Sequence, residues 1–322
     1  MSAAVDIVVV NWNAGPLLAD CVRSVDEARQ KARGWELGRL VVVDNASTDG
    51  SASSLPEVAL VIHKDSNVGF ARACNEGAHH GRAPFVLFLN PDTRLDARSI
   101  EGAVAFLESD AGSRAGIVGV PLVGETGDVD RRCCARAPTA GSLVAHSLGL
   151  DRLLPWVVAP HFLLEWDYSS TREVDQVSGA FFFMRRRVFE ELAGFDERFF
   201  LYYEDVDLSV RAKRAGWSSV FLATTPSYHR GEGTTHRIKA RRLTLSWRSK
   251  IEFARKHFGE TSATLVALTT AIVEPLVRVL FSLARTDIIG AKEILEATGA
   301  LWDRGEKPHV SAFGRKSFDL RA

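Results

Sequence analysis

Three carboxylates stand within four positions directly behind a run of aromatic residues, in residues 199–208. Acidic side chains on a solvated face are usually interleaved with Lys or Arg, whereas Glu204, Asp205 and Asp207 follow Phe and Tyr. Carboxylates set against apolar surface tend to have raised pKa values, which a general base working near neutral pH needs. Glu204 and Asp205 are therefore candidate catalytic residues that remove a proton. In the structural alternative, Asp205 caps a helix and Asp207 pairs with Arg211 one turn later, and we favour that role for Asp207.

Polar side chains also follow three of the apolar runs that we predict to be strands. They are Asn11 and Asn13 after the first run, Asp44 and Asn45 after the second, and Asn90 and Asp92 after the fourth. In open α/β sheets, ligands bind beyond the carboxyl ends of the strands. These strand ends therefore predict one shared crevice.

Asp44 and Asp92 are the carboxylates of this crevice. Asp44 lies in a turn-forming segment, residues 44–50, and can accept a hydrogen bond from a ring NH or a ribose hydroxyl. Asp92 offers a hard oxygen to a divalent cation such as Mg²⁺, which typically takes one or two protein carboxylates together with phosphate oxygens and water. The structural alternatives are that Asp44 caps its turn and that Asn90-Pro91-Asp92 forms an ordinary one.

Two further segments could contact a charged ligand. Residues 67–72 open a predicted helix, and their backbone amides, with Arg72, could steady a diphosphate. His229 lies just past the last predicted strand and is a candidate metal ligand. The alternatives are a plain entry from loop to helix and a histidine that only makes structural hydrogen bonds.

Alternating strands and helices must position these residues. Continuous apolar runs rich in β-branched or aromatic residues are typical of strands buried on both faces, which occur in parallel sheets covered by helices. Such runs lie at residues 7–10, 40–43, 58–62 and 85–89, and helical patterns lie at residues 17–33, 71–80 and 99–107. The order βαβαβ predicts an α/β fold with a doubly wound, mostly parallel sheet flanked by helices.

The second half of the chain is less regular. Residues 124–172 predict a mobile loop and an acceptor-side subdomain. Beyond them, the pattern predicts an apolar run that Ser178 and Gly179 interrupt, then two helices and a strand. These elements lie at residues 174–184, 187–193, 205–215 and 220–222.

The C-terminal part is first basic and then apolar. Residues 237–250 are rich in Lys and Arg, and residues 265–283 are strongly apolar but contain Glu274, Pro275 and Arg278. Because the longest uninterrupted run is shorter than the roughly 20 residues that a span requires, we do not expect a transmembrane helix. The segment could lie on an anionic membrane surface, or form a helical pair that packs on the core or makes a homodimer.

The composition is that of an ordinary globular protein. Of the 322 residues, 46% are hydrophobic, and Lys plus Arg equals Asp plus Glu at 40 each, so no overall field favours nucleic acid. The four cysteines show neither zinc-ligand spacing nor a disulfide framework, which suits a reducing compartment. The N-terminus has no secretory signal pattern, and we therefore expect a cytoplasmic protein.

The motifs occur in an order that resembles a known family. They lie at residues 8–13, 43–50, 67–71, 89–93, 177–180 and 194–208. Over about residues 5–235 the series resembles the family 2 inverting glycosyltransferases. The closest likeness is to the rhamnosyltransferase-like branch, which uses dTDP-L-rhamnose in building bacterial cell-surface polysaccharides. The resemblance implies a GT-A fold and transfer of a sugar to a lipid-linked or growing glycan.

The resemblance also implies roles for single residues. Asp205, with Glu204 beside it, would take the proton from the acceptor hydroxyl in a single displacement. Asp92 and His229 would hold a divalent cation, Mg²⁺ or Mn²⁺, although Asn90 replaces the first acid of the family's Asp-x-Asp motif. Asp44 would contact the nucleobase. The other residues that would bind the nucleotide-sugar are Asn11, Asn13, Asn45, Asn67, Gly69, Arg72, Asn90 and Gly179.

Finally, the resemblance implies an organisation and a set of partners. Residues 1–235 would form the glycosyltransferase domain, with a nucleotide-binding half to about residue 122 and an acceptor-side half after it, and residues 236–322 a helical extension. The donor would be a dTDP- or UDP-sugar, and the acceptor a glycan or a polyprenyl-diphosphate-linked sugar at the inner face of the membrane. The alternatives are a non-catalytic nucleotide-sugar-binding scaffold and a dinucleotide-dependent oxidoreductase, although residues 11–16 lack the glycine-rich fingerprint of the latter.

Overall fold

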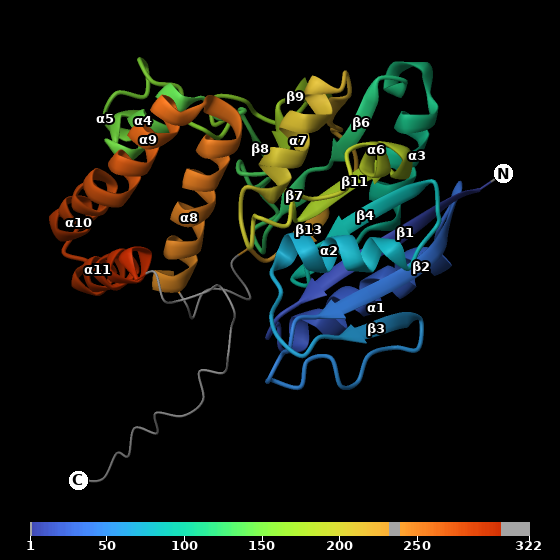
Figure 1. Ribbon diagram of the computed structural model, residues 1–322. Coiled ribbons are helices and arrows are strands. Elements are labelled where there is room, and N and C mark those ends of the chain that lie inside the picture. Colours follow the sequence, from blue (N-terminus) through green and yellow to red (C-terminus); the bar gives the residue numbers. More distant parts are fainter. Residues whose placement is uncertain (1, 232–238, 304–322) are drawn as a thin grey trace, which may run out of the picture.

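A mixed β-sheet occupies the centre of the larger part of the molecule, with helices packed against it (Figure 1). The computed structural model describes residues 2–231 and 239–303. The strand order of the eight-stranded sheet is β3-β2-β1-β4-β11-β6-β12-β9. The strands are β1 (Ala3–Asn11), β2 (Trp35–Asp44), β3 (Ala59–His63), β4 (Phe85–Leu89), β6 (Ala115–Gly119), β9 (Arg172–Val174), β11 (Phe181–Arg185) and β12 (Ser218–Phe221).

The sheet is parallel in its first half and mixed in its second. Strands β3, β2, β1 and β4 are parallel, as are β6 and β12, whereas β11 and β9 are antiparallel to their neighbours. The helices that connect the strands are α1 (Pro16–Gln30), α2 (Phe70–His79), α3 (Ala97–Glu108), α6 (Arg186–Glu191) and α7 (Glu204–Arg214). All of β4 and nearly all of β1 are buried, as expected for strands covered on both faces. The predicted α/β class is confirmed.

The sequence pattern does not predict the central strand β6. Its sequence, Ala-Gly-Ile-Val-Gly, contains two glycines, which weaken an isolated strand. Packing explains both: a Cβ atom at Gly119 would lie 2.6 Å from the Cβ of Val177, and one at Gly116 would lie 2.9 Å from the Cβ of Trp217. Tertiary contacts therefore override the local preference at this strand.

A group of helices lies beside the sheet (Figure 1). It contains α4 (Ala140–Ser147), α5 (Leu150–Leu153), α8 (Lys239–Phe258), α9 (Glu260–Leu268), α10 (Glu274–Ala284) and α11 (Ile288–Trp302). A second apolar core, which includes Phe199, Val206, Leu143, Phe253 and Val266, joins this group to α7. Because α4 and α5 come from the irregular middle of the chain, that segment supplies part of the helical group. The division at residue 235 stays a prediction.

A π-helical turn, Thr269–Val273, joins α9 and α10 into one long helix. By length and composition alone, Glu260–Ala284 is long and apolar enough to cross a membrane, with a mean hydropathy of 1.7 over an 18-residue window; the expectation that it does not span one stays a prediction. In its middle, Glu274 is buried and accepts a hydrogen bond of 2.9 Å from the indole of Trp247. Glu274 also pairs with Lys250 and Arg278. The long helix is therefore tied to α8 by a buried ionic cluster.

Candidate active site

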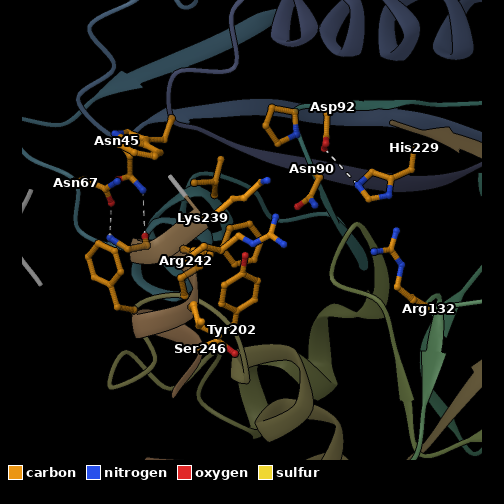
Figure 2. Close-up of a pocket in the computed structure, with 18 of the residues that line it drawn as sticks. Asn45, Asn67, Asn90, Asp92, Arg132, Tyr202, His229, Lys239, Arg242 and Ser246 are labelled. Carbon is orange, nitrogen blue, oxygen red and sulfur yellow. Dashed lines mark hydrogen bonds and ion pairs between the residues drawn. The ribbon is translucent and has the colours of Figure 1, made fainter. Parts of the chain in front are cut away.

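A cleft of about 620 Å³ opens between the carboxyl ends of the parallel strands and the helical group. Figure 2 shows the side chains that face it. Of the residues predicted from sequence, those that line it are Asn45, Asn67, Gly69, Asn90, Asp92 and His229. The opposite wall consists of residues 200–202 and of side chains from the C-terminal helices, among them Lys239, Arg242 and Arg278. The crevice predicted at the strand ends is thus present, with a second wall that the sequence does not predict.

Asp92 and His229 meet at one corner of the cleft. Asp92 follows β4, and His229 ends β13 (Ser227–His229), which pairs with β5 (Thr93–Arg94) and carries His229 opposite Thr93. The backbone N–H of Arg230 donates to the carbonyl of Asp92 at 3.1 Å, which fixes the two segments together. The Nε2 atom of His229 lies 3.4 Å from Oδ1 of Asp92 (Figure 2).

This pair fits a cation that is shared with a phosphate ligand. Among residues 2–231 and 239–303, no group of three or more His, Cys, Asp or Glu side chains could hold a metal ion by itself. Mg²⁺ in phosphate-binding sites typically takes one or two protein carboxylates and completes its shell with phosphate oxygens and water. Asp92 and His229 therefore fit a divalent cation whose remaining ligands come from a diphosphate.

Asn11, Asn13 and Asp44 form a hydrogen-bonded unit next to the cleft but do not line it. The amide of Asn11 donates to Oδ1 of Asp44 at 2.7 Å, and Oδ1 of Asn13 accepts from the N–H of Thr48 at 2.8 Å. The Oδ1 atom of Asn11 is buried and has no hydrogen-bond partner within the described chain. This unpaired acceptor and the carboxylate of Asp44 are suitable groups for a nucleobase, and that role stays a prediction.

The loop before α2 is held against the loop before α7. Asn45 donates from Nδ2 to the carbonyl of Gly69 at 3.1 Å, and the N–H of Gly69 donates to Oδ1 of Asn67 at 3.0 Å (Figure 2). Gly69 has φ 90°, and a Cβ atom there would lie 2.7 Å from the carbonyl oxygen of Phe200. Any side chain at this position would separate the two loops.

Arg72 does not join this arrangement. Its side chain is 60% exposed, and its Nε lies 3.7 Å from Glu197, outside the set of residues that line the cleft. The placement gives no support for a contact between Arg72 and a diphosphate. The cations that face the cleft come instead from Arg132 and from α8 and α10.

Two strained tyrosines precede the acidic cluster. Tyr202 and Tyr203 both have φ 68°, a conformation that costs of order 1–3 kcal/mol for a residue other than glycine. The loop is fixed by bonds to its carbonyls: Phe200 accepts from the N–H of Phe70 at 2.7 Å, and Leu201 accepts from the hydroxyl of Ser249 at 2.8 Å. A strained backbone persists where the surrounding contacts fix its geometry. Here these contacts fix the loop so that α7 begins behind the cleft wall.

Asp205 is held by three N–H donors. Its Oδ1 accepts from the N–H of Val206 at 2.8 Å, and its Oδ2 accepts from the N–H of Gly179 at 3.1 Å and from Nε2 of Gln176 at 3.0 Å. Burial raises the pKa of Asp205, although these donors favour the charged form. Ala180, the residue after Gly179, accepts a hydrogen bond at its carbonyl from the N–H of Asn90, which lines the cleft. The segment that holds the carboxylate of Asp205 is therefore attached to the cleft wall. Asp205 does not itself line the cleft.

Glu204 differs from Asp205 although the two are adjacent. It is buried, and its Oε2 has no hydrogen-bond partner among the described residues. Burial and then the charge of Asp205 raise the pKa of Glu204 well above its usual value. Three donors favour the charged form of Asp205 and oppose the rise of its pKa, whereas Oε2 of Glu204 receives none.

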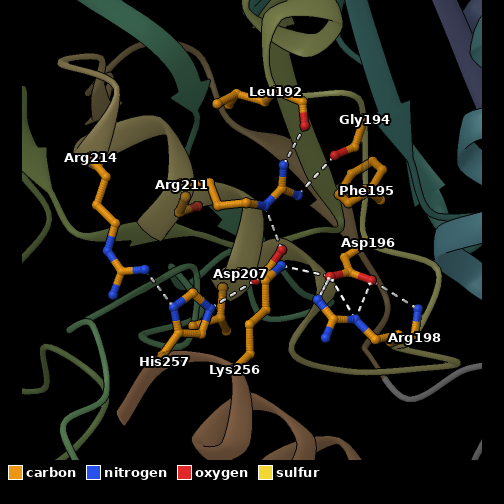
Figure 3. A network of polar contacts seen from close by, with 12 residues as sticks. Leu192, Gly194, Phe195, Asp196, Arg198, Asp207, Arg211, Arg214, Lys256 and His257 are labelled. Atoms are coloured by element: carbon orange, nitrogen blue, oxygen red, sulfur yellow. Dashed lines mark hydrogen bonds and ion pairs between the residues drawn. The ribbon is translucent and has the colours of Figure 1, made fainter. Parts of the chain in front are cut away.

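Asp207 has the structural role favoured from sequence. Its carboxylate is fully buried, receives Nε of Arg211 at 2.7 Å, and lies 2.6 Å from Lys256 and 2.8 Å from Nε2 of His257 (Figure 3). Arg211 also donates to the carbonyls of Leu192 and Gly194, which fixes the loop before the cluster. The predicted pairing of Asp207 with Arg211 is confirmed. The alternative in which Asp205 caps the helix does not hold, because Tyr203 occupies the N-cap of α7.

Comparison with known proteins agrees with this arrangement. A model described as glycosyl transferase family 2 matches residues 6–193. An N-acetylglucosaminyl-diphospho-decaprenol L-rhamnosyltransferase of Mycobacterium tuberculosis is 30% identical over 291 residues, which are 82% of this chain and 89% of that protein.

Solved structures show the same fold at low sequence identity. The mannosyltransferase PcManGT from Pyrobaculum calidifontis, in complex with GDP-Man and Mn²⁺, has a TM-score of 0.54 at 16% identity and covers 94% of this chain and 88% of that one. S. aureus TarS 1-349 in complex with UDP-GlcNAc has a TM-score of 0.50 at 15% identity, with 93% and 92% covered. The family match and the mycobacterial relative, not the fold alone, overturn the alternative of a dinucleotide-dependent oxidoreductase. The chain belongs to glycosyl transferase family 2 and is a glycosyltransferase with a GT-A fold.

Proposed function

We propose that this enzyme transfers L-rhamnose from dTDP-L-rhamnose to a hydroxyl group of a polyprenyl-diphosphate-linked glycan, with inversion at the anomeric carbon. The resemblance of the motif series to the rhamnosyltransferase-like branch supports the donor. The name of the mycobacterial relative supports both the sugar and the acceptor class. The observation that carries the chemistry is the position of Asp205, which Gly179 and Gln176 hold next to the strand end that bears Asp92.

Asp205 serves as the general base in this proposal. An ionised carboxylate offers about four acceptor positions, and the three bonds to Val206, Gly179 and Gln176 use all but one of them. The remaining position accepts the proton of the acceptor hydroxyl as its oxygen attacks the anomeric carbon. Attack opposite to the departing nucleotide inverts the configuration in one displacement.

The opposite end of the donor lies at Asp92 and His229. A divalent cation, Mg²⁺ or Mn²⁺, would be held by this pair and would supply charge stabilisation for the leaving diphosphate. Asn45 and Asn67 position the loop at Gly69 along the same wall. Phe200, Leu201 and Tyr202 cover the cleft from the other side and limit the access of water.

A donor screen tests the proposal. Nucleotide release is measured for dTDP- and UDP-sugars, with and without a short-chain prenyl-diphosphate N-acetylglucosamine acceptor. The expected result is release from dTDP-L-rhamnose that depends on the acceptor. Preference for another sugar would replace the proposed donor, and nucleotide binding without acceptor-dependent release from any donor would favour the non-catalytic scaffold.

We also propose that the helical group contacts a membrane surface at the cytoplasmic face. The outer side of the long helix Glu260–Ala284 carries large apolar side chains that are about half exposed or more: Leu265, Leu268, Ile272, Leu276, Leu280 and Leu283. Trp156, on the loop after α5, is 78% exposed. A large exposed apolar surface usually marks a contact with protein or lipid. The exposed Trp156 and the exposed basic residues Arg285 and Lys292 favour lipid.

Replacing Leu276 and Leu280 together by Glu is expected to reduce binding to anionic liposomes by about tenfold or more, because two apolar side chains no longer leave water. Flotation of the full chain with phosphatidylglycerol-containing vesicles measures this. Leu60→Glu, at a 40% exposed leucine of the edge strand β3, is the matched control and should float like the wild type. Unchanged flotation of the double variant with a shift from dimer to monomer would show that this face serves a homodimer instead.

A further inference from the structure

The cleft wall that faces Asp92 and His229 is positively charged. Lys239 and Arg242 line it from the first turn of α8 (Figure 2). Arg278 lines it from α10. Among the described residues that line the cleft, Asp92 is the only carboxylate. The cleft therefore has a cationic wall contributed by the C-terminal helices, across from the wall that carries the strand ends.

Arg278 is held in place from behind by a buried carboxylate. Its Nε donates to Oε1 of Glu274 at 2.8 Å, while the amino group of Lys250 pairs with Oε2 of the same residue. Although burial opposes ionisation, Lys250 and Arg278 hold the pKa of Glu274 well below its usual value. Two cations thus share one carboxylate, which leaves a net positive charge in this group. Arg278, whose side chain is 25% exposed, presents this charge to the cleft.

The backbone at this point supports a functional role. The π-helical turn Thr269–Val273 ends directly before Glu274, the first residue of α10, so the extra residue of the turn sets the rotation of α10 and with it the direction of Arg278. Single π-helical turns inside α-helices occur frequently at functional sites. The local geometry therefore agrees with a ligand at Arg278.

The donor does not account for this charge. A donor diphosphate at Asp92 and His229 is offset by a divalent cation, and Arg132 lies at the same corner (Figure 2). Lys239 and Arg242 add positive charge on the far wall, where Lys239 reaches its carboxylate partner, Glu293, only at 4.0 Å. A second anionic group at this wall would face three cationic side chains, Lys239, Arg242 and Arg278.

We propose that Arg242, Arg278 and Lys239 form a second anion site, which binds the diphosphate of a lipid-linked acceptor; this inference rests on the proposed function. The planar guanidinium groups of arginine suit phosphate oxygens because they donate in a fixed fork. Leu276 and Leu280 are 62% and 67% exposed, and each stands two positions from Arg278 in α10, so helical spacing places them on another side of the helix. One helix diameter, roughly 10 Å, thus separates the anion site from the apolar surface, a distance that a prenyl chain can bridge.

Binding of citronellyl diphosphate, a short soluble prenyl diphosphate, tests the site. The titration uses the full chain with dTDP and Mn²⁺ present. Arg242→Gln is expected to weaken binding of this probe by about tenfold, because a charge-assisted hydrogen bond is lost, and Lys239→Gln to weaken it by about threefold. Both variants should keep the affinity for dTDP within about twofold of the wild type.

Arg255→Gln is the matched control, since it removes one charge from the exposed side of the same helix, outside the cleft. It should leave probe binding unchanged. Equal probe binding by the wild type, Arg242→Gln and Lys239→Gln would overturn the inference, and so would a loss of dTDP affinity without a loss of probe affinity, which would assign these cations to the donor. If Arg242-dependent probe binding persists while no lipid-linked acceptor receives sugar, the anion site stands and the proposed function fails.

Discussion

Asp205→Asn is expected to lower kcat by about 10³-fold, while the affinity for the nucleotide donor stays within about twofold of the wild type. The carboxylate is the proton acceptor in the proposed displacement, and an amide cannot take that proton. The hydrogen bonds of the Asp205 side chain are to Gly179, Gln176 and Val206, none of which lines the cleft. Turnover with saturating donor and acceptor measures the first effect, and calorimetric titration of the nucleotide measures the second.

Glu204→Gln is the matched control, because it changes the adjacent carboxyl group in the same way. Burial and the charge of Asp205 raise the pKa of Glu204 well above its usual value, which favours its neutral form, so the neutral amide should lower kcat by no more than about tenfold. A larger loss of kcat in Glu204→Gln than in Asp205→Asn would show that Glu204, and not Asp205, is the base. Wild-type turnover in Asp205→Asn would remove the base from this cluster altogether.

The pH dependence of kcat gives a second measurement of the same assignment. A base must be deprotonated to act, so activity is lost as the pH falls through the pKa of Asp205, which burial raises. The amide of Gln176 donates to this carboxylate at 3.0 Å and favours its charged form. In Gln176→Leu the acid limb should therefore move to higher pH. If the acid limb does not move in Gln176→Leu, the ionisation of a group other than Asp205 causes it.

The sequence predicts the donor side of this site because that side is built by local rules. Apolar runs without polar interruption become buried parallel strands, and polar residues at their ends meet at one edge of the sheet. Asn45, Asn90 and Asp92 reach the cleft for this reason. The pairing of Asp207 with Arg211 follows equally from helical spacing.

The rest of the site depends on contacts between residues far apart in the chain. Gln176 has no local feature that marks it, and its role arises only when β10 (Gln176–Val177) is brought against the start of α7. The basic residues after residue 236 look like a membrane-binding patch in sequence. Arg242 nevertheless lines the cleft, because the buried group of Glu274, Lys250 and Trp247 holds α8 against α10.

Asp92→Ala is expected to weaken binding of dTDP in the presence of Mn²⁺ by about 100-fold, because the carboxylate is one of two side chains in the described cleft that can hold the cation. In EDTA the wild type and Asp92→Ala should bind dTDP with equal affinity, because the metal contributes to binding in neither protein. Calorimetric titration under both conditions gives the two affinities. His229→Ala should produce a smaller loss in the same direction, since Asp92 supplies the charge of the pair.

Asn90 provides the complementary test of the metal corner. The family's Asp-x-Asp motif would place an acid at this position, and Asn90 lines the cleft beside Asp92. Asn90→Asp adds a second carboxylate and should strengthen Mn²⁺-supported binding of dTDP, whereas Asp128→Ala, at an exposed carboxylate outside the cleft, should leave it unchanged. Equal dTDP affinities of the wild type and Asp92→Ala with Mn²⁺ would mean that the diphosphate is neutralised by side chains alone. Arg132 would then be the residue to replace next, because it faces the same corner as His229 (Figure 2).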